Sequence, residues 1–245
     1  MRKILLKVQF LGTNYCGWQY QEGLPTIQGE LERAIFETTG EHVSCASSGR
    51  TDAGVHAIAM PVVFETNTRI ISGNIYKAIN AYLPTDIRVL SSMEVEGDFH
   101  PRFDCVGKTY AYHFYVSNIP LPYLSSTQAY IVPPFNFELA RSVLPHFRGK
   151  HDWVGFASAK IEVSSTIRTI KRISLSRAGE NQYCLRVSGD GFLYNMVRII
   201  AGTIIEVGQG KINSADIPAI IASKDRSRAG KTAPAVGLVL ESVDY

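Results

Sequence analysis

Alternation of apolar and polar positions predicts a β-α-β-β-α-β order of elements in the first hundred residues. Every second side chain of residues 3–11, from Ile4 to Phe10, is apolar, which is typical of a half-buried strand. Apolar residues three and four positions apart then predict a helix that begins after Thr26 and ends at Gly40. The other predicted elements of this half are strands over 43–46, 57–64 and 87–95 and a helix over 71–83.

The second half repeats this order of elements without repeating the residues. Its predicted strands cover 106–116, 167–175, 183–187 and 236–243, and its predicted helices cover 137–147, 192–207 and 214–222. We therefore predict an α+β fold of two ferredoxin-like (βαββαβ) halves, residues 1–100 and 101–245. Side by side, the halves would form one mixed, mainly antiparallel sheet with helices on one side and a cleft between the halves.

Composition favours a folded protein with a polyanionic partner. The chain has 245 residues, of which 45% are hydrophobic and 19% charged, so it can bury a sizeable core and is not expected to be disordered. The net charge is +3 and is unevenly distributed. Residues 1–100 hold 8 Lys and Arg against 11 Asp and Glu, whereas residues 101–245 hold 17 against 11. A chance fluctuation is the alternative to an anion-binding second half.

The four cysteines indicate a reducing compartment and no metal site. They are scattered along the chain, no CxxC pair occurs, and no histidine spacing typical of zinc ligands lies near them. We expect thiols that are not oxidised, as in the cytosol.

No segment is expected to enter a membrane. The longest apolar stretch, 192–207, contains Asn195, Arg198 and Glu206, and the N-terminal apolar run is too short for a signal peptide. The sequence therefore predicts a cytoplasmic protein.

The segment 48–56 carries the main candidate for chemistry. It brackets Arg50 and Asp52 with two glycines between two predicted strands, which exposes a carboxylate at a sheet end and holds it by short connections. A carboxylate can act as a base or as a nucleophile at a sugar carbon. The alternative is an aspartate that only hydrogen-bonds its own turn.

Two further segments carry candidate residues. Arg198 lies inside an apolar helix, where an arginine either finds a buried partner or extends from the helix edge to solvent. Lys108 and Tyr110 share one face of an aromatic strand, which could stack bases or could be an ordinary core strand.

Basic residues gather in two segments of the second half. Such clusters can neutralise phosphates, although a solvated charged loop is equally expected from the sequence. They are Arg168, Lys171, Arg172, Lys224, Arg226, Arg228 and Lys231.

Five blocks in order resemble the tRNA pseudouridine synthase A family along the whole chain. The segment 48–57, Ser-Gly-Arg-Thr-Asp-Ala-Gly-Val-His-Ala, is similar to its active-site motif. The other blocks are 17–19 with 26–32, 99–103 with 108–112, 191–198, and 225–227 with 229–235 and 237–238. Pro101 stands where the family usually has a small residue, and Lys108 stands where arginine is usual. Lysine keeps the charge but loses the planar fork, so geometry at Lys108 is less certain.

The resemblance implies isomerisation of uridine to pseudouridine at positions 38, 39 and 40 of the tRNA anticodon stem-loop. It also implies a homodimer that binds tRNA and needs no cofactor or metal. Carried over to this chain, Asp52 is the nucleophile, Tyr110 stacks on the target base and Arg198 pairs with Asp52. Arg50 would fill the gap left by the flipped base, and Lys108 would contact the substrate.

A uridine inside a stem hides its glycosidic bond and must be flipped out before it can react. Flipping costs a few kcal/mol, which stacking of the base on Tyr110 could offset. The attack could occur at the sugar C1′ or the base C6, or Asp52 could act as a base through a glycal. Two alternatives are a non-catalytic RNA-binding protein and a nucleoside glycosidase, although no second carboxylate is evident near Asp52.

Overall fold

The computed structural model describes residues 1–158 and 164–245 and divides the chain into two compact units. The first unit is Met1–Val106 with Val239–Tyr245, and the second is Gly107–Leu238. The sequence predicts a division between residues 100 and 101, whereas these units group residues 101–106 and the C-terminal strand with the first half.

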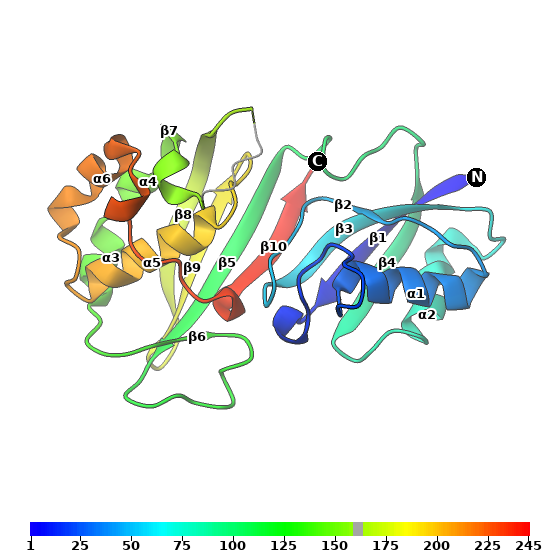
Figure 1. The fold of residues 1–245 in the computed structure, drawn as a ribbon, viewed down its shortest axis with the longest axis horizontal. Helices are drawn as coiled ribbons and strands as arrows, with labels where there is room; N and C mark the ends of the chain where they lie inside the picture. The colour runs from blue at the N-terminus through cyan, green and yellow to red at the C-terminus, as the bar shows by residue number, and fades with distance from the viewer. Residues whose placement is uncertain (159–163) are drawn as a thin grey trace. The chain divides into compact units, whose positions relative to one another are not determined.

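The first unit has a mainly antiparallel sheet with two helices over one face (Figure 1). Its strands are β1 (Arg2–Phe10), β2 (Ala46–Ser47), β3 (His56–Thr66), β4 (Ile87–Val95) and β10 (Leu238–Asp244), and its helices are α1 (Ile27–Thr39) and α2 (Ile75–Asn80). β1 lies antiparallel between β3 and β4, β2 pairs antiparallel with β3, and β10 pairs parallel with β3. The order β4-β1-β3-β2 is that expected of a ferredoxin-like unit.

The local signals in the sequence explain this unit. The side chain of Thr26 accepts a 3.2 Å hydrogen bond from the Gly29 amide and caps α1, and Gly40 ends the helix in the left-handed conformation at φ 72°. The predicted apolar stripe of α1, from Ile27 to Ile35, is buried against the sheet.

The second unit has a sheet in the order β5-β9-β8-β7, with β6 pairing parallel to the end of β5. Its strands are β5 (Gly107–Val116), β6 (Ala129–Ile131), β7 (Gly149–Asp152), β8 (Ile167–Gly179) and β9 (Gln182–Gly189). Its helices are α3 (Phe137–Ser142), α4 (Leu144–Phe147), α5 (Met196–Gly208) and α6 (Ile217–Ser223), and they gather on one side of this sheet (Figure 1). The predicted α+β class with mainly antiparallel pairing is confirmed.

Several predicted elements differ in extent for identifiable reasons. The helix expected over 137–147 breaks into α3 and α4 at Val143, two residues before Pro145, which has no amide hydrogen to continue a helix. The helix expected from 192 begins only at Met196, because Asn195 is left-handed at φ 61°. The helix expected over 71–83 is a 3₁₀ turn followed by the short α2.

The strands differ as well. The strand expected over 43–46 is only the two-residue β2, and the strands β6 and β7 were not predicted. β8 and β9 are longer than expected and meet in a tight turn, where Asn181 adopts φ 52°.

No helix in the described ranges has the length and apolar character required to cross a bilayer. None of the four cysteines, all of which are described, forms a disulfide.

Candidate functional site

Asp52 lies on a tight turn between β2 and β3 of the first unit. Its carbonyl oxygen accepts a 3.1 Å hydrogen bond from the amide of Val55, and Gly54 takes the left-handed conformation at φ 78° that closes the turn. The side chain of Asp52 is half-buried. The predicted placement of this carboxylate on a glycine-bracketed turn between strands is therefore confirmed, but the residue is half-buried and not exposed as expected.

The segment 17–18 holds the residue before Asp52. The amide of Trp18 donates a 3.0 Å hydrogen bond to the carbonyl oxygen of Thr51. Gly17 has φ 93°, and a Cβ at this position would lie 2.7 Å from the same oxygen. Only glycine permits so close an approach in this conformation. The two backbones are thus packed directly on each other.

The first turn of α1 supports this segment in turn. Its amides at Ile27 and Gln28 donate hydrogen bonds of 3.2 and 2.9 Å to the carbonyl oxygens of Gly17 and Trp18. These are donors that a helix start leaves without an intrahelical partner. The helix therefore anchors the support of the Asp52 turn. Sequence reasoning missed this function, although both segments occur in the blocks that carry the family resemblance.

The other end of the turn is held by His56, the first residue of β3. Its ring Nδ1 accepts a 2.9 Å hydrogen bond from the amide of Gly12, and the side chain is buried. A Cβ on Gly12 would lie 2.0 Å from the carbonyl oxygen of Val55, so these backbones also touch. Arg50, on the other side of Asp52, is exposed.

Tyr110 lies on β5 of the second unit. Its ring meets the edge of Phe192 at a centroid distance of 5.3 Å and an interplanar angle of 89°, and it is half-buried. The next residues on the same face, Tyr112 and Phe114, are fully buried. Lys108 is half-buried near the start of the strand. The core interpretation of this strand thus holds for Tyr112 and Phe114, whereas Tyr110 keeps an accessible ring.

The hydroxyl of Tyr112 confirms its structural function. It donates a 2.8 Å hydrogen bond to the carbonyl oxygen of Pro234. Burial raises the pKa of this phenol well above its usual range, with the Arg198 guanidinium opposing the effect only in part.

Arg198 lies in the first turn of α5 and is half-buried. Its Nε donates a 2.8 Å hydrogen bond to the carbonyl oxygen of Ala233, and its Nη1 donates one of 2.8 Å to Oδ1 of Asn195. Its own carbonyl oxygen accepts a 3.1 Å hydrogen bond from the Ala233 amide. The guanidinium is therefore fixed at two points, although the residue keeps partial exposure at the helix edge.

A strap of residues 229–235 runs along α5 and supplies one of these points. A Cβ on Gly202 would lie 1.8 Å from the carbonyl oxygen of Lys231, so the strap rests on the bare backbone of the helix. The amide of Gly230 also donates a 2.9 Å hydrogen bond to the hydroxyl of Thr203. Arg198 is consequently held between α5 and the strap.

The basic cluster divides between structural and exposed residues. Arg226 donates hydrogen bonds of 3.0 and 3.1 Å to the carbonyl oxygen of Gly230 and the hydroxyl of Thr232, so it braces the strap. Lys224 pairs with Asp152 at 2.9 Å. Four further basic residues are exposed and are candidates for phosphate contacts: Lys171, Arg172, Arg228 and Lys231.

The candidate residues thus belong to two units. Arg50 and Asp52 lie together in the first unit, and Lys108, Tyr110 and Arg198 lie in the second. The pairing of Arg198 with Asp52, the joined sheet and the cleft between the halves stay predictions.

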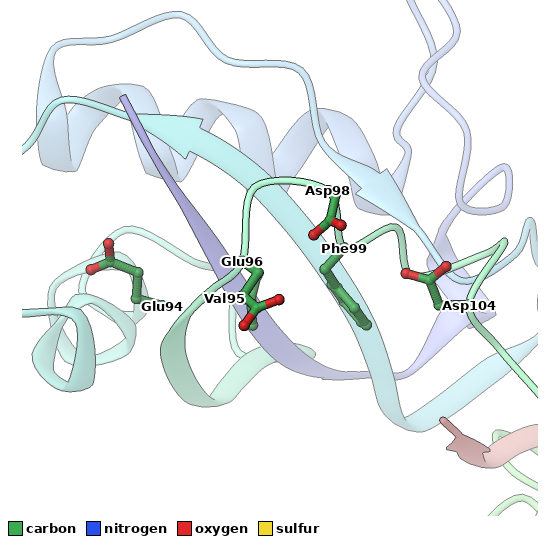
Figure 2. Close-up of a pocket in the computed structure, with 6 residues that line it drawn as sticks. All are labelled: Glu94, Val95, Glu96, Asp98, Phe99 and Asp104. Carbon is green, nitrogen blue, oxygen red and sulfur yellow. The ribbon is translucent and has the colours of Figure 1, made fainter.

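A hollow of about 800 Å³ in the first unit lies outside this set of residues. Figure 2 shows the carboxylates of Glu96, Asp98 and Asp104 near Phe99, with Glu94 standing apart along β4. Four carboxylates disfavour a nucleic-acid phosphate, so we assign no RNA contact to this hollow. In the described part of the chain, no three His, Cys, Asp or Glu side chains are grouped to hold a metal ion.

Comparison with known proteins places the chain in a family. A family model described as tRNA pseudouridine synthase matches residues 7–104 and 144–245. The tRNA pseudouridine synthases A of Clostridium acetobutylicum and Acetivibrio thermocellus are each 43% identical to this chain, and that of Geotalea daltonii is 40% identical. In each comparison the match covers 100% of both chains. The family model matches most of the chain and these relatives match all of it, so the chain belongs to the tRNA pseudouridine synthase family.

Proposed function

We propose that this protein is a tRNA pseudouridine synthase, an isomerase that converts uridine to pseudouridine at positions 38, 39 and 40 of the anticodon stem-loop. The observation that carries the proposal is the Asp52 turn, which aims a half-buried carboxylate from a backbone fixed at both ends. Relatives named tRNA pseudouridine synthase A are 43% identical to this chain over its full length, which supports tRNA as the substrate.

In this proposal, each candidate residue has a distinct function. Asp52 acts on the ribosyl or base carbon as nucleophile or base, and Arg198 pairs with it. Tyr110 offers a half-exposed ring for stacking on the flipped base, since its own edge contact with Phe192 fixes the ring orientation. Arg50, which is exposed, fills the gap in the stem, and Lys108 contacts the substrate.

The reaction is balanced without a cofactor. The C1′–N1 glycosidic bond of uridine breaks and a C1′–C5 bond forms. A proton leaves C5 to solvent, and N1 gains a proton. Base flipping, which exposes these atoms, costs a few kcal/mol, and stacking on Tyr110 is expected to offset part of it.

The proposal extends to assembly and location. We infer a homodimer that binds tRNA, because the sequence resembles a family whose members are homodimers. We also infer a cytoplasmic location, in keeping with the thiol state of the four cysteines.

Release of tritium from C5-labelled uridine in tRNA tests the function. Wild type should release tritium into water and Asp52→Asn should not, while both should bind the tRNA with similar affinity. Asp98→Asn, the same change at an exposed carboxylate of the same unit, serves as the matched control and should release tritium as wild type does. Substrates with uridine replaced at 38, 39 or 40 separately would identify the modified positions.

Each other outcome points to a different conclusion. Binding without tritium release by wild type would favour a non-catalytic structured-RNA-binding protein. Release by Asp52→Asn at the wild-type rate would remove Asp52 from the chemistry. Free uracil in place of pseudouridine would indicate a glycosidase.

A further inference from the structure

We propose that His56 is a positioning residue for Asp52, acting through the backbone of the turn that carries Asp52. The residue is 4% exposed, and its ring Nδ1 accepts a 2.9 Å hydrogen bond from the amide of Gly12. This proposal rests on the proposed function in one respect only, namely that Asp52 is the reacting group.

The hydrogen bond from the Gly12 amide requires an acceptor at the position of His56 Nδ1. A backbone amide can only donate, so the accepting Nδ1 carries no proton. The donor belongs to a buried residue, and a buried amide without an acceptor costs about 1–3 kcal/mol. The hydrogen bond to the buried Gly12 amide therefore holds the His56 ring in one orientation, because breaking it would leave that amide without an acceptor.

The bond ties two backbones that already touch. A Cβ on Gly12 would lie 2.0 Å from the carbonyl oxygen of Val55, the residue before His56. The backbone of His56 also pairs with Val239 of β10 in parallel register. His56 consequently fixes the point at which the Asp52 turn enters the sheet.

The second anchor lies on the other side of Asp52. The carbonyl oxygen of Thr51 accepts the 3.0 Å hydrogen bond from Trp18. Both donors, at Gly12 and Trp18, come from the connection between β1 and α1, residues 11–26. Asp52 is thus spanned by two anchors in the same segment, one immediately before it and one four residues after it. Loss of either anchor removes one of the two bonds that tie the turn to this segment, while the backbone of His56 stays paired with β10.

A carboxylate that must attack a single carbon is sensitive to such a loss. A displacement of about 1 Å at a reacting group can reduce a rate by about 100-fold, while binding contacts made elsewhere are unaffected. We therefore expect loss of the His56 acceptor to lower the rate of the chemical step and not the affinity for tRNA.

Three substitutions separate this function from simple packing. His56→Asn keeps an acceptor near the position of Nδ1, His56→Gln moves the acceptor one bond further out, and His56→Leu fills the space without an acceptor. We would measure single-turnover tritium release at saturating tRNA, the Kd for tRNA and the melting temperature of each variant. Hydrogen exchange at the Val55 amide, which donates to the carbonyl oxygen of Asp52, would report on the turn without reference to activity.

The expected result is a release rate for His56→Asn within about threefold of wild type, and rates for His56→Gln and His56→Leu reduced at least tenfold at unchanged Kd. Exchange at the Val55 amide should rise in the same two variants. Equal impairment of Asn and Gln, or rates that follow the melting temperature alone, would overturn the proposal.

The two proposals fail in different ways. If wild type released no tritium, the proposed function would fail, and the exchange data would still decide whether His56 positions the turn. If wild type released tritium and exchange did not distinguish Asn from Gln, only the function assigned to His56 would be wrong. The Gln variant keeps this comparison open should the Leu variant not fold.

Discussion

The amide of Trp18 donates a 3.0 Å hydrogen bond to the carbonyl oxygen of Thr51, so a residue outside the Asp52 turn fixes the peptide next to the candidate nucleophile. The contact depends on Gly17, whose missing side chain lets the two backbones meet. The amides of the first turn of α1 hold this segment from behind. The geometry of Asp52 is therefore set by parts of the chain more than twenty residues before it.

Gly17→Ala should reduce the rate of pseudouridine formation with little change in tRNA affinity. A Cβ would lie 2.7 Å from the oxygen of Thr51, and the backbone would have to keep φ 93°, so the segment must move away from the turn. Because this displaces the peptide before Asp52, we expect a loss between about tenfold and 100-fold. Single-turnover tritium release and tRNA binding measure the two quantities separately.

Gly23→Ala is the matched control for this change. Gly23 is also left-handed, at φ 73°, but no atom lies within 4 Å of the position its Cβ would take. It should show only the backbone cost of roughly 1–2 kcal/mol in the free energy of unfolding, with a normal rate. Equal rates for the two alanine variants would contradict the importance of the contact at Thr51.

The sequence predicts the turn that carries Asp52, but not the distant backbone contacts that hold this turn in place. Hydrophobic alternation and the glycines around Asp52 predict a carboxylate on a turn between strands, as the structure confirms. The contacts of Gly12 with Val55, and of Gly17 with Thr51, join positions more than thirty residues apart. A pattern of local periodicity holds no information on such contacts, since only the folded backbone brings the residues together.

The aromatic strand β5 shows a second limit. Alternation placed Tyr110, Tyr112 and Phe114 on one face, but two of these rings are buried and the third is half-exposed. The difference arises from the strap and from Phe135, which cover Tyr112 and Phe114 respectively and lie far along the chain.

Gly202→Ala should disturb Arg198 although alanine is the better helix former. The new Cβ would lie 1.8 Å from the carbonyl oxygen of Lys231, which forces the strap off α5 and weakens the bond between Arg198 and Ala233. We expect this steric effect to exceed the gain of about 1 kcal/mol in helix propensity. The variant should therefore melt at a lower temperature and lose activity.

Gly73→Ala provides the comparison, because no atom lies within 4 Å of the position that its Cβ would occupy. Its stability and activity should stay near those of wild type. A stabilised and fully active Gly202→Ala protein would show that the strap can shift without consequence for Arg198.

Tyr110→Phe should separate stacking from proton transfer. The phenylalanine ring keeps the edge contact with Phe192 and the surface for a base, so tRNA affinity should be unchanged. If the hydroxyl assists removal of the C5 proton, the release of tritium should slow by 10² to 10⁴-fold, the usual range for a general acid or base. Tyr110→Leu should in addition weaken binding, since stacking on an aromatic ring contributes roughly 1–3 kcal/mol per base. A Phe variant that releases tritium at the wild-type rate would restrict Tyr110 to stacking.

Asp152→Asn should change the dependence of stability on pH in the second unit. The Thr166 hydroxyl, which donates a 2.5 Å hydrogen bond to Oδ1, and the Lys224 ammonium at 2.9 Å from Oδ2 hold the pKa of this carboxyl below its ordinary value. A carboxyl whose pKa is lower in the folded state stabilises the fold above its unfolded-state pKa of about 3.9, and this stabilisation is lost as the pH falls through the folded-state pKa.

At pH 7 the Asn variant should therefore be less stable than wild type by about 1 kcal/mol, the net contribution of one hydrogen bond, and the difference should begin to shrink as the pH falls below ~3.9. Urea unfolding of the whole chain between pH 3 and pH 7 measures it. Glu180→Gln, at the exposed turn between β8 and β9, removes a charge without such partners and should show a small difference that is independent of pH. If the difference in the free energy of unfolding between wild type and Asp152→Asn stays constant over this pH range, Thr166 and Lys224 do not favour the ionised form of Asp152.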